Sequence, residues 1–143
     1  MKIIILECTG SKEIINHFAK YGFSDVILFK NRNDRKETER EANITELNGF
    51  SCEGTRDKLL KIKGSLEERF FVVYSNDITI FDINNIIKSH KGSQKIATLI
   101  EYKKALCAAF FEREVVDYMN CGKSLERDVL KRIGEEQELA IYK

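Results

Sequence analysis

The sequence has no proline, few cysteines and histidines, and no long apolar run. Its four cysteines, Cys8, Cys52, Cys107 and Cys121, include no closely spaced pair, and only two histidines accompany them. The paired ligands of a typical zinc site are therefore missing. Nothing approaches the roughly 20 apolar residues of a membrane span. We expect reduced thiols in or near a core, and no membrane partner.

The sequence has no excess of charge of one sign. Its 24 Lys and Arg residues nearly balance its 23 Asp and Glu residues, and the formal net charge is +1. Binding to nucleic acid needs clustered basic residues, so no nucleic-acid partner is expected. The start, MKIIILEC, lacks the features of a signal peptide, which indicates a cytoplasmic protein. A length of 143 residues, 43% of them hydrophobic, fits one globular domain over residues 1–143.

The N-terminal part of the sequence predicts a strand, a helix and a second strand. Residues 2–6 form an isoleucine-rich run typical of a buried parallel strand. We expect Ser11 to cap the following helix and Gly22 to end it. Residues 25–30 follow as a strand. A strand, helix and strand of this length imply a right-handed crossover and parallel pairing.

The stretch RFFVVYSNDITIFDINNIIKSHK, residues 69–91, predicts a buried strand that carries an acidic residue to its carboxyl end. The apolar run 70–74 is followed closely by Asp77. In open α/β sheets, ligands bind at the carboxyl ends of the strands. Asp82 is expected to cap a helix over residues 83–91.

The remaining elements follow from the same patterns. We predict strands over 42–47, 95–102, 105–111 and 139–142, and helices over 56–66, 112–119 and from Ser124 through SLERDVLKRIGEE. His90 is expected at a helix end, satisfied by local hydrogen bonds or by solvent.

Several of these stretches resemble the sugar-phosphate nucleotidyltransferases, including the glucose-1-phosphate cytidylyltransferase type. Ile15-Asn16-His17 and the following KYGF match a helix-and-strand segment of that family, and residues 70–91 match a segment in which an aspartate helps to hold the catalytic Mg²⁺. By position this aspartate is Asp77, so the resemblance implies Asp77 as a metal ligand and Mg²⁺ as a cofactor. A turn or cap role is the alternative for Asp77. Asn76 stands where the family has glycine, and asparagine tolerates a left-handed backbone.

The resemblance also implies nucleotide-binding residues. Glu53-Gly54-Thr55-Arg56 resembles a loop that packs on the nucleotide base, which gives Gly54 and Thr55 this role; simple turn chemistry before a helix explains the same residues. Lys12 lies in a loop where a phosphate contact would be expected. The C-terminal blocks FFEREVVDYM and SLERDVLKRIGEEQELAIYK match the family pattern as well.

The sequence departs from the family where substrates would be held. ECTGSK, with one glycine and one lysine, replaces a long glycine-rich phosphate loop that ends in a Pro-Lys pair, and such a loop needs several glycines to wrap a triphosphate. A long insertion with a Glu-Lys-Pro element is missing between residues 102 and 105. The absence of proline agrees with the loss of both motifs.

We therefore expect a three-layer α/β nucleotide-binding (Rossmann-like) fold with a mainly parallel central sheet. Two functions remain open. The first is a sugar-1-phosphate nucleotidyltransferase relative, linked to nucleotide-sugar and polysaccharide biosynthesis, which binds a nucleoside triphosphate, a sugar phosphate or Mg²⁺ with impaired or absent catalysis. The second is a non-catalytic remnant that acts as a binding or oligomerisation module, as a homo-oligomer or paired with a full-length relative.

Overall fold

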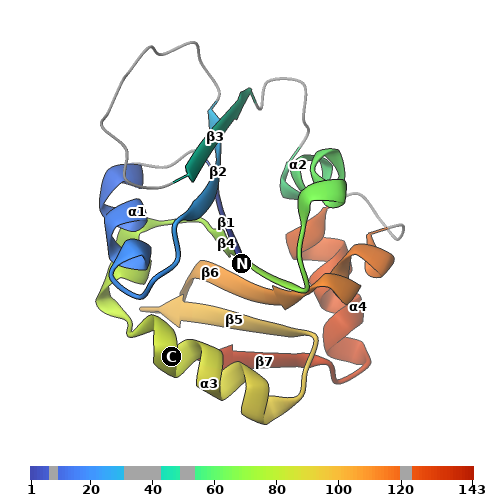
Figure 1. The fold of residues 1–143 in the computed structure, drawn as a ribbon. Helices are drawn as coiled ribbons and strands as arrows, with labels where there is room; N and C mark the ends of the chain where they lie inside the picture. The colour runs from blue at the N-terminus through green and yellow to red at the C-terminus, as the bar shows by residue number, and fades with distance from the viewer. Residues whose placement is uncertain (7–9, 31–42, 49–53, 120–123) are drawn as a thin grey trace.

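The computed structural model describes residues 1–6, 10–30, 43–48, 54–119 and 124–143. Their strands form one seven-stranded sheet in the order β3-β2-β1-β4-β6-β5-β7 (Figure 1). The strands are β1 (Lys2–Ile5), β2 (Asp25–Lys30), β3 (Asn43–Asn48), β4 (Arg69–Val73), β5 (Ala97–Tyr102), β6 (Ala105–Glu112) and β7 (Leu139–Tyr142). Among these strands β6 alone runs against the others, since it pairs antiparallel with both β4 and β5. The expected mainly parallel sheet is confirmed.

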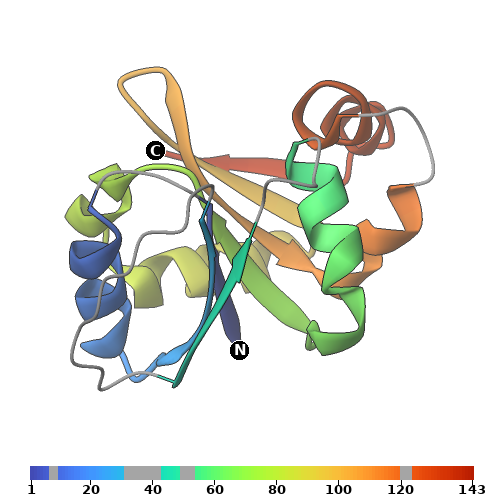
Figure 2. The same cartoon turned by 90° about the horizontal axis from the view of Figure 1, so that it is seen from above.

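Helical elements cover both faces of the sheet. They are α1 (Ser11–Ala19), α2 (Thr55–Lys61), η1 (Lys63–Ser65), η2 (Asn76–Ile80), α3 (Ile83–Ser93), η3 (Arg113–Tyr118), η4 (Leu125–Val129) and α4 (Leu130–Glu135). Figure 2 shows α1 and α3 on one side of the sheet and α2 and α4 on the other. This is the three-layer α/β arrangement expected from the sequence. No helix among the described residues is long and apolar enough to cross a membrane.

Two hydrophobic cores result from the alternation of side chains along the strands. On the α1 and α3 side, Phe71 of β4 stacks on Phe110 of β6, with ring centroids 4.3 Å apart. On the other side, Phe70 and Phe111 meet at 5.5 Å. Neighbouring residues of β4 and β6 therefore support opposite cores, which explains why both strands are almost continuously apolar.

The structure confirms two of the three predicted helix-end residues. Asp82 caps α3 as expected, and its Oδ1 accepts hydrogen bonds from the backbone N–H groups of Asn84 and Asn85 at 2.9 and 3.2 Å. Gly22 ends α1 with a positive φ of 89°. The expected cap at Ser11 is wrong, because the N-cap is Gly10, in the left-handed conformation, and no side-chain cap is present there.

The C-terminal third is less regular than its pattern suggests. The predicted α-helix over 112–119 is a 3₁₀-helix, and the helix after Ser124 starts as one stretch of π-helix before it becomes α4. The strand predicted over 139–142 is confirmed as β7. Cys107 is buried with a free thiol. Cys8, Cys52 and Cys121, for which reduced thiols were also predicted, lie outside the described residues.

Candidate functional site

The order of the strands creates one switch point in the parallel part of the sheet. From β1 the chain moves outward to β2 and β3, and then returns to place β4 on the other side of β1. Ligands of open α/β sheets bind at such a switch point, outside the carboxyl ends of the two strands. Here those ends lead to Gly10 and to Asn76.

Gly10 and Asn76 are in close contact at this edge. A Cβ atom placed on Gly10 would lie 2.6 Å from Nδ2 and 2.9 Å from Cβ of Asn76, and 3.0 Å from Oε1 of Glu13. Gly10 also has a φ of 87°, which L-residues with a side chain adopt at a cost. Both the space and the backbone therefore require glycine.

Asp77 lies beside this contact, in the first turn of η2. Its backbone N–H donates to Oγ of Ser75 at 3.0 Å, so Ser75 is the residue that caps η2. The Asp77 side chain is half-buried, and no hydrogen bond or ion pair joins its carboxylate to another described residue. The structure thus leaves the Asp77 carboxylate available at the switch point.

Glu13 adds a second carboxylate that the sequence analysis missed. It lies exposed in the first turn of α1, and its Oε1 approaches the same Gly10–Asn76 contact. A glutamate in the first turn of a helix normally indicates only a favourable dipole interaction. Its position near Asn76 follows from the packing of α1 against η2, which only the fold shows.

Cys107, near the start of β6, contacts the turn that carries Asp77 through its backbone carbonyl. Its carbonyl accepts hydrogen bonds from the N–H groups of Tyr74 and Ser75 at 2.9 and 3.2 Å, which fixes the turn that carries Asp77. Burial, together with the negative charge of Asp77, raises the pKa of the Cys107 thiol to about 11. The thiol therefore stays protonated at neutral pH and is a poor nucleophile or metal ligand.

The predicted residues Gly54 and Thr55 lie at the start of α2. Gly54 has φ 98° and ψ −177°, a region that glycine alone adopts readily. Thr55 is only 8% exposed. Nearby, the Tyr74 hydroxyl donates to Oε2 of Glu126 at 2.6 Å. Burial and the Glu126 carboxylate raise the pKa of Tyr74 well above its usual range.

The Tyr74–Glu126 hydrogen bond ties the carboxyl end of β4 to η4. The nucleotide-binding role of Gly54 and Thr55 stays a prediction. Lys12 is exposed in the first turn of α1, next to Gly10, and its phosphate contact stays a prediction as well.

The donor atoms at the switch point suit a hard divalent cation. Asp77 and Glu13 supply carboxylate oxygens, the ligands that Mg²⁺ and Mn²⁺ prefer. No group of three or more His, Cys, Asp or Glu side chains that could hold a metal is present in the part of the chain that the structure describes. Mg²⁺ sites commonly use one or two carboxylates and complete their shell with water and substrate phosphates. The residues present fit a cation that arrives with a phosphate ligand.

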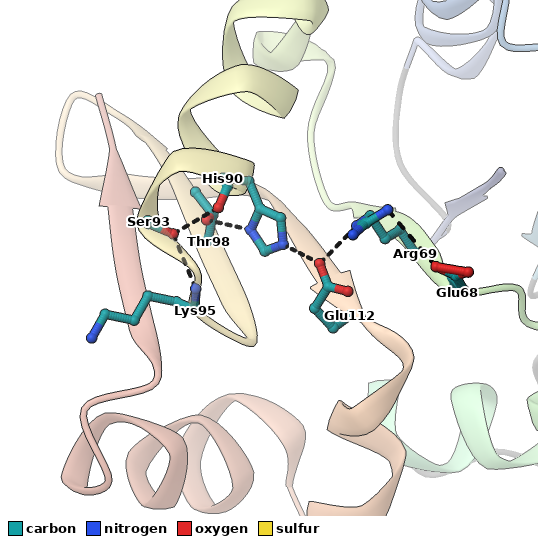
Figure 3. Close-up of polar contacts among 7 residues, drawn as sticks. All are labelled: Glu68, Arg69, His90, Ser93, Lys95, Thr98 and Glu112. Atoms are coloured by element: carbon teal, nitrogen blue, oxygen red, sulfur yellow. Dashed lines mark hydrogen bonds and ion pairs between the residues drawn. The ribbon is translucent and has the colours of Figure 1, made fainter.

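A second polar cluster, centred on His90, lies at the amino ends of β4 and β5, which is the opposite end of these strands (Figure 3). Nε2 of His90 lies 2.7 Å from Oε2 of Glu112, and Nδ1 lies 2.7 Å from Oγ1 of Thr98. Because the carboxylate can only accept, Nε2 carries the proton and Nδ1 accepts from the Thr98 hydroxyl. Nε of Arg69 donates to the same Glu112 oxygen at 2.8 Å.

His90 lies in the last turn of α3, as expected. The expected local or solvent partners are wrong, since its ring joins α3 to β5 and β6. Its connectivity resembles that of a hydroxyl, imidazole and carboxylate triad, but Thr98 and His90 are each 1% exposed. A substrate could not reach the Thr98 oxygen. We therefore assign this cluster to the joining of four elements, α3, β4, β5 and β6, rather than to catalysis.

Comparisons with known proteins place the fold. No family model matches the sequence, and no curated protein matches it. Solved structures do match. 2-C-methyl-D-erythritol 4-phosphate cytidylyltransferase from Francisella tularensis superposes with a TM-score of 0.59 at 12% identity, over 99% of this chain and 88% of that chain.

Rv0371c from Mycobacterium tuberculosis H37Rv also matches. Its manganese complex gives a TM-score of 0.59 at 10% identity, and a second structure gives 0.59 at 9% identity; each match covers 98% of this chain and 85% of the other. At these identities the likeness concerns the fold. The chain shares the α/β fold of these structures.

Proposed function

We propose that this protein binds a nucleoside triphosphate together with a divalent cation at the carboxyl edge of β1 and β4. One observation carries the proposal: the Asp77 carboxylate has no hydrogen bond or ion pair to another described residue, and Asp77 directly follows Asn76, which contacts Gly10 at the switch point of the sheet. The manganese complex of a structure with the same fold supports a divalent cation. Mg²⁺ or Mn²⁺ would be held by Asp77 and Glu13 with phosphate oxygens of the ligand.

The reaction class that goes with this site is nucleotidyl transfer to a sugar phosphate. A phosphate oxygen of the sugar phosphate would attack the α-phosphorus, a new P–O bond would form, the bond between the α- and β-phosphates would break, and pyrophosphate would leave. Such transfer depends on positioning and on neutralising the charge on the phosphate oxygens. A bound cation would neutralise most of the negative charge on the phosphate oxygens. Lys12, exposed two residues after Gly10, would neutralise the rest.

Calorimetric titration with CTP, UTP, GTP and dTTP, each with Mg²⁺, with Mn²⁺ and with EDTA, tests the binding. We expect saturable binding of at least one nucleotide that requires the cation. Asp77→Asn should weaken this binding at least tenfold, about 1.4 kcal/mol, and Glu13→Gln should weaken it less. Asp117→Asn is the matched control, because Asp117 is an exposed carboxylate beyond the far end of β6, and it should bind as the wild type does.

Stability measurements separate a ligand role of Asp77 from a structural one. Because Ser75 provides the cap of η2, Asp77→Ala should leave the free energy of unfolding nearly unchanged. A loss of well over 1 kcal/mol would make Asp77 structural. Absence of binding at millimolar nucleotide, or binding that ignores both the cation and Asp77, would refute the proposed site.

A second candidate function is a non-catalytic binding module. The observation that favours it is the connection between β5 and β6, which consists of Lys103 and Lys104 alone. In the enzymes that the sequence resembles, a long insertion that carries sugar-binding residues lies between the corresponding strands. Pyrophosphate release in the presence of a nucleotide that binds and a panel of sugar 1-phosphates distinguishes the two candidates: release indicates the transferase, and binding without release indicates the module.

A further inference from the structure

Strand β7 leaves one edge of the sheet open. In the described part of the chain it pairs with β5 and with no second strand. An open edge presents unpaired N–H and C=O groups to any other strand, and proteins usually protect it with charged residues, proline or a bulge. Leu139–Tyr142, sequence LAIY, contains no charged residue and no proline, and its register with β5 is regular.

One side chain of this edge is also exposed to an unusual degree. Ile141 is 54% exposed, and Ile80 is the other large hydrophobic residue that stands out in this way among the described residues, at 57%. Ile141 lies on the strand itself, in register with Leu99 of β5. A strand added alongside β7 would cover Ile141 and satisfy the edge at the same time.

The direction of the backbone groups follows from the ladder with β5. The Glu138 carbonyl accepts from the N–H groups of Ile96 and Ala97, so it points toward β5. In a parallel pair of strands, every second residue directs both its N–H and its C=O toward the neighbouring strand, and the residues between them direct theirs to the other side. Ala140 and Tyr142 therefore bond to β5, whereas Leu139 and Ile141 direct their N–H and C=O groups outward.

We propose that β7 pairs antiparallel with β7 of a second copy of this chain, which joins the two sheets across a two-fold axis. When the two-fold axis is perpendicular to the sheet, residues that face each other must have their side chains on the same face. An odd-numbered residue therefore faces an odd-numbered one, and an even-numbered residue faces an even-numbered one. With Ala140 opposite Ala140 of the second copy, Leu139 faces Ile141 and the outward peptide groups of both residues exchange hydrogen bonds. Each exposed Ile141 is then covered by an apolar neighbour.

Charge at the ends of the strand favours the same arrangement. Glu138 precedes β7 and Lys143 follows it. Antiparallel pairing brings the acidic end of one strand to the basic end of the other, where opposite charges on neighbouring strands attract. A parallel arrangement would bring like charges together. The second copy is therefore the partner that this edge fits best.

Two substitutions at one position test the pairing. Ile141→Lys places a charge at the centre of the edge. Ile141→Pro removes an N–H that bonds to no other strand in the single copy, so the fold should tolerate it, because proline is accepted on edge strands where the N–H faces solvent. Thr45→Lys is the matched control, since Thr45 is exposed on β3 at the other edge of the sheet.

Sedimentation velocity over about 1–200 µM protein provides the readout, together with thermal melting to confirm folding. We expect a concentration-dependent dimer for the wild type and for Thr45→Lys, and a monomer with a folded melting profile for both Ile141 variants. Amide exchange at Leu139 and Ile141 should slow as the concentration rises. A wild-type monomer throughout this range, or a dimer that survives Ile141→Pro, would overturn the proposal, and loss of the dimer in Thr45→Lys would move the interface to β3.

Discussion

Gly10 connects the conformation of the backbone with the space available at the switch point. Its left-handed φ lets the chain turn from the β1 end into α1, and its missing side chain lets Asn76 approach. The family that the sequence resembles has its glycine at the position of Asn76. In this protein the glycine is Gly10, on the other side of the contact. Substitutions at residues 10 and 76 should therefore be energetically coupled.

Replacing Gly10 should therefore be costly, and the cost should depend on residue 76. We expect Gly10→Ala to destabilise the protein by about 2 kcal/mol, because the left-handed backbone alone costs about 1–2 kcal/mol and the new Cβ meets the Asn76 side chain. In the double variant with Asn76→Gly, the loss should be smaller than the sum of the single losses by about 0.5–1 kcal/mol. Urea unfolding of the four proteins measures this coupling, and strictly additive losses would contradict the contact.

His90 is the second residue whose surroundings set its chemistry. Burial lowers the pKa of the imidazole below its usual value of about 6.5, and the hydrogen bond and negative charge of Glu112 offset this in part. As the pH falls, the unfolded chain takes up the proton first. The contribution of neutral His90 to stability is therefore complete above about pH 6.5 and is lost as the pH falls toward the pKa of the folded state.

Unfolding free energies at pH 7.5, 6.5 and 5.5 should show this dependence. We expect stability to decrease toward pH 5.5 in the wild type and in a His17→Gln background, in which His90 is the remaining histidine. His90→Gln in the same background should flatten the dependence, although the variant is less stable at every pH. An unchanged slope in His90→Gln would assign the pH dependence to carboxylates instead.

The turn between β5 and β6 is the element whose sequence agrees least with its geometry. Lys103 and Lys104 form a two-residue hairpin with φ values of 53° and 67°. Two positive φ angles define a type I′ turn, which strongly prefers Asn-Gly. Neither lysine offers the local hydrogen bond or the missing Cβ that makes this conformation inexpensive.

Installing the preferred turn should stabilise the whole protein. We expect Lys103→Asn combined with Lys104→Gly to raise the free energy of unfolding by about 1 kcal/mol. The midpoint of urea unfolding measures the change, and Lys61→Asn with Lys63→Gly, at exposed positions in and beside α2, serves as a control that should not stabilise. A neutral or destabilising result in the turn would mean that its two left-handed residues are not the source of strain.

Element type could be predicted well from the sequence, whereas contacts across elements could not. The bounds of β2 and β7 follow from β-rich runs between polar residues, and the cap at Asp82 follows from its place before an apolar repeat. By contrast, the partners of His90 come from β5 and β6, so spacing along α3 carries no information about them. For the same reason, the sequence did not predict that Asn76 lies against Gly10, close to Glu13.

At the scale of the molecule, a single sheet holds two cores on its opposite faces. β4 and β6 contribute neighbouring residues to both cores. Neither core can therefore lose its packing without disturbing the strands that support the other. We therefore expect the sheet and both cores to form one cooperative unit.

Thermal unfolding should consequently be a single transition. We expect the calorimetric and van't Hoff enthalpies to agree, and the circular dichroism of the backbone to change together with the aromatic signal. A measurement below the concentration at which any dimer forms keeps association out of the comparison. Two resolved transitions would show that the β3-β2-β1 part and the β5-β7 part unfold separately.

The reversed direction of β6 also has a consequence for the time course of folding. Every parallel pair in this sheet joins strands that are far apart in the sequence or separated by a helix or an intervening segment, whereas β5 and β6 are joined by a two-residue turn. Short loops close fastest, and hairpins form within microseconds. We therefore expect the β5–β6 hairpin to form first during refolding. The carboxyl ends of β1 and β4, where Asp77 lies, come together only when these two strands pair. Nucleotide binding would report the last step of folding rather than the first.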